Sequence, residues 1–409
     1  MFGGLRGRAA GHIRRVRSGG MKVLYVNQTS QMSGAEHSLL TLIHGLRHRV
    51  HAELACPEGD LADAARERGL AVHPIQGTDV TLQLDPFATP KALAEIAVDG
   101  ARIARLSRRG GFDLVHANTT RAGLIATMFA GVGAKPTVVH VRDWTPEGVV
   151  SGAILQYARI RASALICISQ LVADEFPAHP ASTPLHVIHN PIDLRRFDPD
   201  RIDRAAARAA LGLAEDEFAV AVVAQLTPWK GQEEAIRAVA QLRERHPSLR
   251  LLVVGSPKFQ SARLDNQAYA DALHALPAEL GASDIVRFLG ERKDIPEILR
   301  ALDVLLVPSW KEAFGRIVVE GMAMELPVMA TDVGGPKEII TSGVDGILAP
   351  PQDPAAWAAA LERLIGGPGL RADLASQARV SAVERFTPEL AAERVWAVYE
   401  RTAGLGFAS

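Results

Sequence analysis

Cysteine is scarce in this sequence, with only Cys56 and Cys167 among its 409 residues. The two lie far apart, each in an apolar, strand-like run. Two thiols are too few for a disulfide framework or for a structural zinc site. We therefore expect buried, reduced cysteines in a cytoplasmic protein, one that works in the cytosol or at the inner face of the membrane.

Long apolar runs and an excess of one charge are also missing. No stretch of about 18 uninterrupted apolar residues occurs, so the sequence predicts no transmembrane helix. The 45 basic and 46 acidic residues give a net charge of -1, which offers no general attraction for nucleic acid. A chain of 409 residues exceeds the size at which one core keeps growing, so about two domains are expected.

Positive charge is concentrated in two short stretches. Residues 1–20 hold five arginines, no acidic residue and no apolar segment of the kind that a secretory signal requires. They form either a membrane-surface or targeting tail or an unstructured extension ahead of Met21. The stretch RIARLSRRGG at 102–111 belongs either to a peripheral membrane contact or to a solvated helix face.

Short β-rich runs alternate with helical patterns throughout the chain. Strand-like runs occur at 21–27, 52–56, 114–118, 137–143, 164–169 and 185–190, and they restart at 219–226 after a turn-rich segment at 190–200. This alternation predicts two doubly wound, Rossmann-like parallel sheets. We expect an N-terminal domain at 21–196, a second domain at 197–386, and a helix at about 387–405 that packs back onto the first domain.

Candidate functional residues lie in the loops after the strands, because open α/β sheets bind ligands at the carboxyl ends of their strands. The loop after the first strand reads NQTSQMSGAEH (27–37), and neither it nor its counterpart in the second half contains GxGxxG. The dinucleotide fingerprint of a dehydrogenase is therefore absent.

The most informative segment is PSWKEAFGRIVVEGMA at 308–323, which reads as a strand end, a loop and a helix start. Gly315 permits close backbone approach, and the amides after it would be unpaired helix-start donors that suit a diphosphate. Glu320 is placed to accept from sugar or ribose hydroxyls, although a carboxylate there also complements the helix dipole. A second glycine turn into a helix, TDVGGPKEII, follows at 331–340.

Lys230 is the candidate phosphate cation. It lies in TPWKG, between a strand and a helix, where an ammonium group can act as a point charge on a phosphate. The alternative is an ordinary lysine in a surface turn.

In the first half, the turn SGAEH at 33–37 brings the amides of Gly34 and Ala35 near an anion or an acceptor. Two pairs of polar residues also lie at strand ends, where side chains two residues apart share one face. The pairs are His116 with Asn118 and His140 with Arg142. Each is either structural or part of a functional site.

Together these motifs resemble the large retaining glycosyltransferases of the GT-B fold, glycosyltransferase family 4 or group 1, from about Met21 to about Phe386. The strongest marker is E-x7-E from Glu312 to Glu320, followed by P-V-x-A-T-x-x-G-G-x-x-E. PWKG, VIHNPIDLRRF, FLGERKDIPEIL and SGAE are further matches, and all the motifs stand in the family's order. The resemblance implies two Rossmann-like domains that face each other across a cleft.

By that resemblance, Glu312 holds hydroxyls of the transferred sugar, Glu320 binds the ribose and Lys230 neutralises the β-phosphate. The catalytic residues implied are Glu312, Lys230 and His116. The donor-binding residues implied are Glu320, Phe314, Gly315, Arg316, Ile317, Gln225 and Arg292, with Phe314 to Ile317 and Arg292 acting through their backbone. The acceptor-side residues implied are Gly34, Ala35, Asn118, His140 and Arg142. Neither a metal nor a cofactor is expected.

The sequence departs from the family pattern at several positions. Many members carry arginine where this chain has Gln225, so one of two expected phosphate cations is missing. We hypothesise that Arg142 partly replaces this charge from across the cleft, which would be refuted by unchanged donor affinity and turnover in Arg142→Ala. Gly321 and Glu325 also depart from the family's E-A-M-A-x-G-x-P.

The resemblance implies a retaining enzyme that moves a hexose-type sugar from a nucleoside diphosphate sugar, with UDP or GDP expected, to a glycan or lipid-linked acceptor. Such a reaction belongs to cell-surface polysaccharide or glycoconjugate synthesis. One alternative is a sugar-nucleotide epimerase of the 2-epimerase type with the same fold. Another is a catalytically degenerate binding subunit, which Gln225 favours and the two retained glutamates disfavour.

Overall fold

A computed structural model describes residues 20–77, 88–129, 135–144, 148–176, 183–257 and 266–404. The arginines of the basic N-terminal extension thus lie outside the described residues. Within the described ranges, no helix is long and apolar enough to cross a bilayer. Cys56 and Cys167 are free and buried, as expected, and burial raises the pKa of both thiols to about 12.

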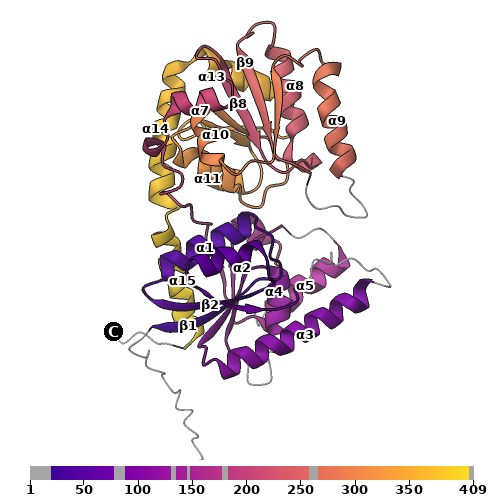
Figure 1. Cartoon of the computed structure of the whole chain (residues 1–409), viewed down its shortest axis with the longest axis vertical. Coiled ribbons are helices and arrows are strands. Elements are labelled where there is room, and N and C mark those ends of the chain that lie inside the picture. Colours follow the sequence, from indigo (N-terminus) through magenta and orange to yellow (C-terminus); the bar gives the residue numbers. More distant parts are fainter. Residues whose placement is uncertain are drawn as a thin grey trace, which may run out of the picture.

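The first half of the chain folds into a seven-stranded sheet with the order β3-β2-β1-β4-β5-β6-β7 (Figure 1). The strands are β1 (Met21–Val26), β2 (Val50–Cys56), β3 (Ala71–Pro74), β4 (Leu114–Ala117), β5 (Thr137–Val141), β6 (Ala164–Cys167) and β7 (Leu185–Val187). All neighbours pair in parallel. Strands such as β6 are buried along their whole length, which explains their continuous apolar sequence.

Helices connect the parallel strands, because a parallel pair needs a crossover. They are α1 (Gly34–Leu46), α2 (Asp60–Glu67), α3 (Ala88–Arg109), α4 (Thr120–Thr127), α5 (Val149–Arg161) and α6 (Gln170–Asp174). Helix α1 begins at a capping box. The Ser33 side chain accepts from the Glu36 backbone N–H, and the Glu36 side chain accepts from the Ser33 backbone N–H. The SGAE turn therefore has a fixed shape.

The second half repeats this plan with a six-stranded parallel sheet of order β10-β9-β8-β11-β12-β13. The strands are β8 (Phe218–Val223), β9 (Leu249–Val254), β10 (Val286–Gly290), β11 (Val304–Val307), β12 (Val328–Thr331) and β13 (Ile347–Ala349). The helices are α7 (Arg204–Ala210), α8 (Gln232–Leu242), α9 (Asn266–Glu279), α10 (Ile295–Ala301), α11 (Arg316–Ala323), α12 (Gly335–Ile339) and α13 (Pro354–Gly366). Two doubly wound parallel sheets, as predicted from the alternation, are thus confirmed.

The last two helices run along one side of both sheets, from the second half back to the first (Figure 1). Helix α14 (Pro368–Arg385) ends just before α15 (Pro388–Thr402), which packs against α1. Tyr399 of α15 is fully buried among residues of the first sheet. The end of the chain thereby helps to build the N-terminal domain.

The two halves are joined by a polar contact at Glu338 of α12. Its carboxylate accepts hydrogen bonds from the backbone N–H groups of Gln170 and Leu171, at 2.8 and 3.0 Å, at the start of α6. His189, in the segment between the halves, approaches the same carboxylate at 3.4 Å and lies against Phe314. This contact helps to set how the two halves face each other.

Candidate active site

A cleft of about 1130 Å³ lies between the carboxyl ends of the two sheets. Helix α1 and helix α11 lie at the facing edges of the two halves (Figure 1). The predicted site residues that line the cleft are Gly34, Ala35, Gln225, Lys230, Arg292, Glu312, Arg316, Ile317 and Glu320. Residues almost 300 positions apart in the sequence are thus brought together.

Lys230 and Glu312 meet on the second-half side of the cleft. Lys230 ends the 3-10 turn η2 (Pro228–Lys230), which follows β8, and Glu312 lies in the loop between β11 and α11. The ammonium Nζ is 2.5 Å from a Glu312 carboxylate oxygen, and both side chains are largely buried. A cation and a carboxylate therefore lie side by side in the loops that follow β8 and β11.

Glycines of the TDVGGPKEII turn shape the loop that carries Glu312. Gly334 has a φ of 65°, and a Cβ there would lie 2.4 Å from the Glu312 carbonyl oxygen. A Cβ on Gly335 would lie 2.2 Å from the Phe314 backbone, and its own N–H donates to the Glu312 carbonyl at 3.0 Å. Only glycine permits this close backbone approach, so the turn of Gly334 and Gly335 packs against the loop that carries Glu312.

Helix α11 begins in the cleft, where the first backbone N–H groups of the helix are hydrogen-bond donors. Gly315 precedes it with a φ of 95°, in the left-handed region that favours glycine. Across the described part of the chain, the structure records no acceptor for the N–H groups of Gly315, Arg316 and Ile317. Free amides at a helix start, together with the helix dipole, make a site for an anion.

The Arg316 side chain bridges this helix start to the opposite half. Its Nε and Nη2 donate to one oxygen of Glu320 at 2.8 and 2.6 Å, and its Nη1 donates to the Gly34 carbonyl oxygen at 3.1 Å. Glu320 is 7% exposed. The sequence interpretation gave Arg316 a backbone role alone, so its guanidinium is a feature that the motif did not predict.

The other predicted donor-side residues differ in whether they line the cleft. Gln225 and Arg292 line the cleft, and Arg292 forms an ion pair with Asp294 in the same loop. Phe314 is 2% exposed and packs against His189 and Phe386. The ring of Phe314 therefore holds the loop in place and does not face the cleft.

Three predicted acceptor-side residues and the predicted catalytic residue His116 require a correction. His116, Asn118, His140 and Arg142 are at most 4% exposed, and none of them lines the cleft. His116 Nδ1 lies 2.7 Å from the Tyr399 hydroxyl of α15, which packs with α1 on one face of the sheet. The role of His116 as a catalytic residue in contact with substrate is therefore withdrawn.

Arg142 is engaged in a buried polar network and does not face the phosphate side. Its Nε donates to Asn118 at 2.9 Å and its Nη1 donates to Asn190. Asn118 in turn donates to Asn27, which donates to Glu36 of the SGAE turn. The hypothesis that Arg142 replaces the charge lost at Gln225 from across the cleft does not fit this geometry.

The buried histidines predict a loss of stability in acid. Burial, reinforced by the charge of Arg142, holds the pKa of His116 and His140 well below the ordinary 6.5. In the unfolded chain both titrate near 6.5, so the unfolded state binds more protons once the pH falls below that value. Each histidine should lower the free energy of unfolding by about 1.4 kcal/mol at pH 5.5, as measured by thermal melts between pH 7.5 and 5.5.

The matched variant for this prediction is His140→Phe. Neither ring nitrogen of His140 has a hydrogen-bond partner among the described residues, so an apolar ring of similar size fits the site. The variant should lose only the contribution of His140, about 1.4 kcal/mol at pH 5.5, while His116 and His37 retain theirs. An acid-dependent drop in melting temperature equal to that of the wild type would contradict the assignment.

Sequence reasoning missed several of the residues that line the cleft. His37, Asp143 and Arg196 all line the cleft. Burial and the charge of Arg316 lower the pKa of His37 to about 4, so its imidazole is neutral at pH 7. Asp143 is the last residue of the strand-like run at 137–143, directly after Arg142, so the end of that run was the signal for it.

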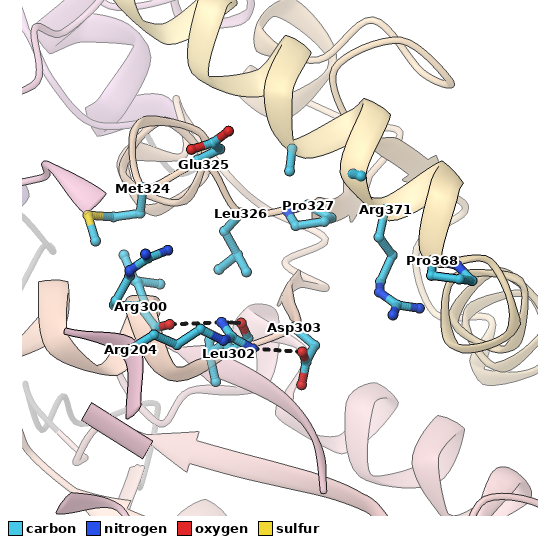
Figure 2. Close-up of a pocket in the computed structure, with 13 residues that line it drawn as sticks. Arg204, Arg300, Leu302, Asp303, Met324, Glu325, Leu326, Pro327, Pro368 and Arg371 are labelled. Atoms are coloured by element: carbon cyan, nitrogen blue, oxygen red, sulfur yellow. Dashed lines mark hydrogen bonds and ion pairs between the residues drawn. The ribbon is translucent and has the colours of Figure 1, made fainter. Parts of the chain in front are cut away.

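A second, smaller cavity lies at the amino ends of β11 and β12, away from the cleft (Figure 2). Arg204 donates to the carbonyl oxygens of Arg300 and Leu302 at 2.9 and 2.5 Å and pairs with Asp303 at 2.8 Å. Arg371 likewise donates to backbone carbonyls at the end of α13. Arg204 ties α7 to the end of α10 and the start of β11, and Arg371 ties α14 to α13, so both have structural roles.

Two family models cover most of the chain. Residues 32–196 match glycosyltransferase family 4 and residues 203–381 match glycosyl transferases group 1. A D-inositol 3-phosphate glycosyltransferase of Actinosynnema mirum is 30% identical over 404 residues, which cover 93% of this chain and 92% of that protein. The protein of the same name from Streptomyces bingchenggensis is 34% identical over 312 residues, which cover 71% of this chain and 67% of that protein.

Solved structures of the same architecture also match. Anabaena HepE in complex with UDP has a TM-score of 0.76 and 26% identity, covering 93% of this chain and 100% of that one. The same protein with UDP-glucose gives a TM-score of 0.74. Sucrose-phosphate synthase from Thermosynechococcus elongatus, at 19% identity, shows a likeness of fold with a TM-score of 0.77 over 93% of this chain and 98% of that one.

Proposed function

Because this chain belongs to the glycosyltransferase group 1 family, we propose that it is a retaining enzyme that transfers a hexose-type sugar from a UDP- or GDP-sugar to a hydroxyl group of a glycan or lipid-linked acceptor. The observation that carries the proposal is the convergence of Lys230, Glu312, Glu320 and the free amides of α11 in one cleft. The UDP and UDP-glucose bound to Anabaena HepE support UDP as the first nucleotide to test.

In the proposed reaction, the bond between the anomeric carbon and the β-phosphate oxygen breaks and a bond to the acceptor oxygen forms on the same face. The leaving phosphate oxygen takes the acceptor proton. Lys230 and the helix-start N–H groups stabilise the charge on the departing diphosphate, so the proposal needs no metal. Glu312 holds hydroxyls of the sugar, and Glu320 accepts from the ribose hydroxyls.

A double displacement would instead need a carboxylate nucleophile. Glu312 is paired with Lys230, and Glu320 is the proposed ribose ligand, which disfavours both in that role. Same-face attack is therefore the mechanism that we favour.

A screen of sugar nucleotides tests the donor. Purified protein is melted with UDP-, GDP-, ADP- and dTDP-sugars, and the true donor at a hundred times its dissociation constant should stabilise the fold by about 2.7 kcal/mol. The donor should then release its nucleotide, and NMR of the product should show the anomeric configuration of the donor. Inverted product, or stabilisation by none of the four, would contradict the proposal.

The same assay separates the two alternatives. An epimerase would interconvert nucleotide sugars without an acceptor, whereas the proposed enzyme would leave the donor's sugar unchanged and release the nucleotide. A degenerate binding subunit would bind a donor but show no donor hydrolysis. The Glu312–Lys230 and Glu320–Arg316 pairs in the cleft favour an active enzyme.

We further propose that the acceptor is met at the inner face of a membrane, during synthesis of a cell-surface polysaccharide or glycoconjugate. Helix α3 supports this location, because it presents the exposed residues Arg102, Arg105, Arg108 and Arg109. Basic residues near a surface attract anionic lipids. Flotation with anionic vesicles, with and without residues 1–20, separates a membrane contact from a solvated basic face.

A further inference from the structure

Arg316 occupies the position where the proposed donor would enter. Its guanidinium lies in the cleft between Glu320, the proposed ribose ligand, and the Gly34 carbonyl of the opposite half. We infer that Arg316 exchanges Glu320 for the diphosphate of the donor and supplies the second phosphate cation that Gln225 does not provide. This inference rests on the proposed function.

The position of Arg316 on its helix is the first support. Arg316 is the first residue of α11, whose unpaired amides form the proposed diphosphate site. A side chain from that residue starts within reach of any anion bound by those amides. Its side chain is 18% exposed and lies within the cleft, not on the outer surface.

The other cations of the cleft are less well placed for this role. Lys230 already supplies the first phosphate cation, and Arg292 is paired with Asp294 within its own loop. Arg196 also lines the cleft, but it donates to the Lys293 backbone carbonyl. Lys293 is exposed on the same loop as Arg292, and it is not part of the start of α11. Arg316 therefore combines a guanidinium with the amide cluster, and a guanidinium matches phosphate geometry through paired N–H donors.

The contacts of Glu320 provide the second support. Both bonds from Arg316 go to the same oxygen, Oε1. A carboxylate that receives two vicinal ribose hydroxyls uses both of its oxygens, so the hydroxyls compete with Arg316 for Oε1. A diphosphate offers the displaced guanidinium a larger negative charge than one carboxylate does, so the exchange proceeds in the direction of donor binding.

The link to Gly34 gives the exchange a further consequence. Arg316 Nη1 donates to a backbone carbonyl of the SGAE turn, 282 residues away in the sequence. When Arg316 turns toward the diphosphate, this tie between the two halves is released. The side chain that the donor recruits is thus the one that ties α11 to Gly34 across the cleft.

Binding of a nucleoside diphosphate and of its nucleoside tests the inference. Calorimetry with UDP and uridine, and with the GDP and ADP pairs, first identifies the pair that binds the wild type. Arg316→Ala should then weaken diphosphate binding about 10- to 100-fold, since a charge-assisted contact is lost. Nucleoside affinity should change by less than about twofold or increase, because Glu320 is freed for the ribose.

Two variants serve as controls. Lys293→Ala removes an exposed cation of the same cleft and should change diphosphate affinity less than about threefold. Arg316→Gln keeps a neutral hydrogen-bond partner for Glu320 and provides the same comparison if the alanine variant fails to fold.

A double-mutant cycle separates direct contact from positioning. If Arg316 binds the diphosphate, Arg316→Ala should still cost at least about tenfold in diphosphate affinity when Glu320 is already glutamine. If Arg316 acts only by orienting Glu320, that cost disappears in the Glu320→Gln background, and the inference is overturned.

Equal losses of nucleoside and diphosphate affinity in Arg316→Ala, or no loss of diphosphate affinity, would likewise overturn it. Failure of the wild type to bind any of the three diphosphates would overturn the proposed function together with the inference. Wild-type binding with a wrong pattern among the variants rejects the inference alone.

Discussion

Replacing Lys230 with alanine is expected to lower the rate of nucleotide release from the donor sugar by about a hundredfold, or about 3 kcal/mol in the activation barrier. The ammonium group lies at the cleft wall, 2.5 Å from Glu312. The leaving diphosphate gains negative charge as the glycosidic bond breaks, and a fixed cation stabilises that charge. The loss should therefore fall mainly on kcat, measured as donor hydrolysis so that no acceptor is needed.

Removing Lys230 also leaves the Glu312 carboxylate without its partner, and two further variants account for this effect. Lys230→Arg retains the charge and should recover part of the rate, although arginine does not reproduce the geometry of an ammonium group. The double variant with Glu312→Gln shows how far the two residues act as a pair, since losses smaller than the sum of the single ones indicate coupling. Turnover of Lys230→Ala within about threefold of the wild type would eliminate the phosphate role.

The donor half of the cleft was accessible from the sequence because its signals are local. The strand, glycine turn and helix around Glu312 and Glu320 are contiguous, so their positions follow from one βα unit. The structure places β11, Gly315 and α11 in that order. The local motif could not predict the direction of the Arg316 side chain, because its partner Gly34 belongs to the other half of the chain.

The acceptor side of the cleft was predicted less well, because the alternation of residues along a strand does not show which strand ends are buried. His116 and Asn118 do stand at the end of β4, as the strand pattern predicted, but they are buried there. Tyr399 bonds to His116 from a helix 283 residues further along the chain. The sequence predicted that this helix packs back onto the first domain but not which residues of the sheet it covers.

Two strands, β3 and β13 (Ile347–Ala349), were missed altogether, and each stands at the edge of its sheet. β3 (Ala71–Pro74) has four residues, stands at the edge of its sheet, and includes a histidine and a proline. An edge strand pairs on one side only and needs neither length nor a continuous apolar run. Its sequence therefore lacks the pattern that identified the central strands.

Replacing Glu320 with alanine is expected to weaken binding of the nucleoside by about 10- to 100-fold, because hydrogen bonds from ribose hydroxyls to a buried carboxylate are lost. Glu320 is 7% exposed and lies one helical turn beyond Arg316. The loss should appear with uridine, or with the nucleoside of the donor that the screen identifies, and not with its 2′,3′-dideoxy analogue. Titration calorimetry of both nucleosides measures the difference.

The matched variant is Glu312→Gln, which alters the other carboxylate of the same motif. Glu312 pairs with Lys230 on the loop before α11, whereas Glu320 pairs with Arg316 on the helix. If the two acids divide the donor between them, Glu312→Gln should leave nucleoside affinity within about twofold and lower turnover of the sugar nucleotide. A loss of nucleoside affinity in Glu312→Gln equal to that in Glu320→Ala would mean that both carboxylates serve the same end of the donor, and the assignment of one to the sugar and one to the ribose would have to be abandoned.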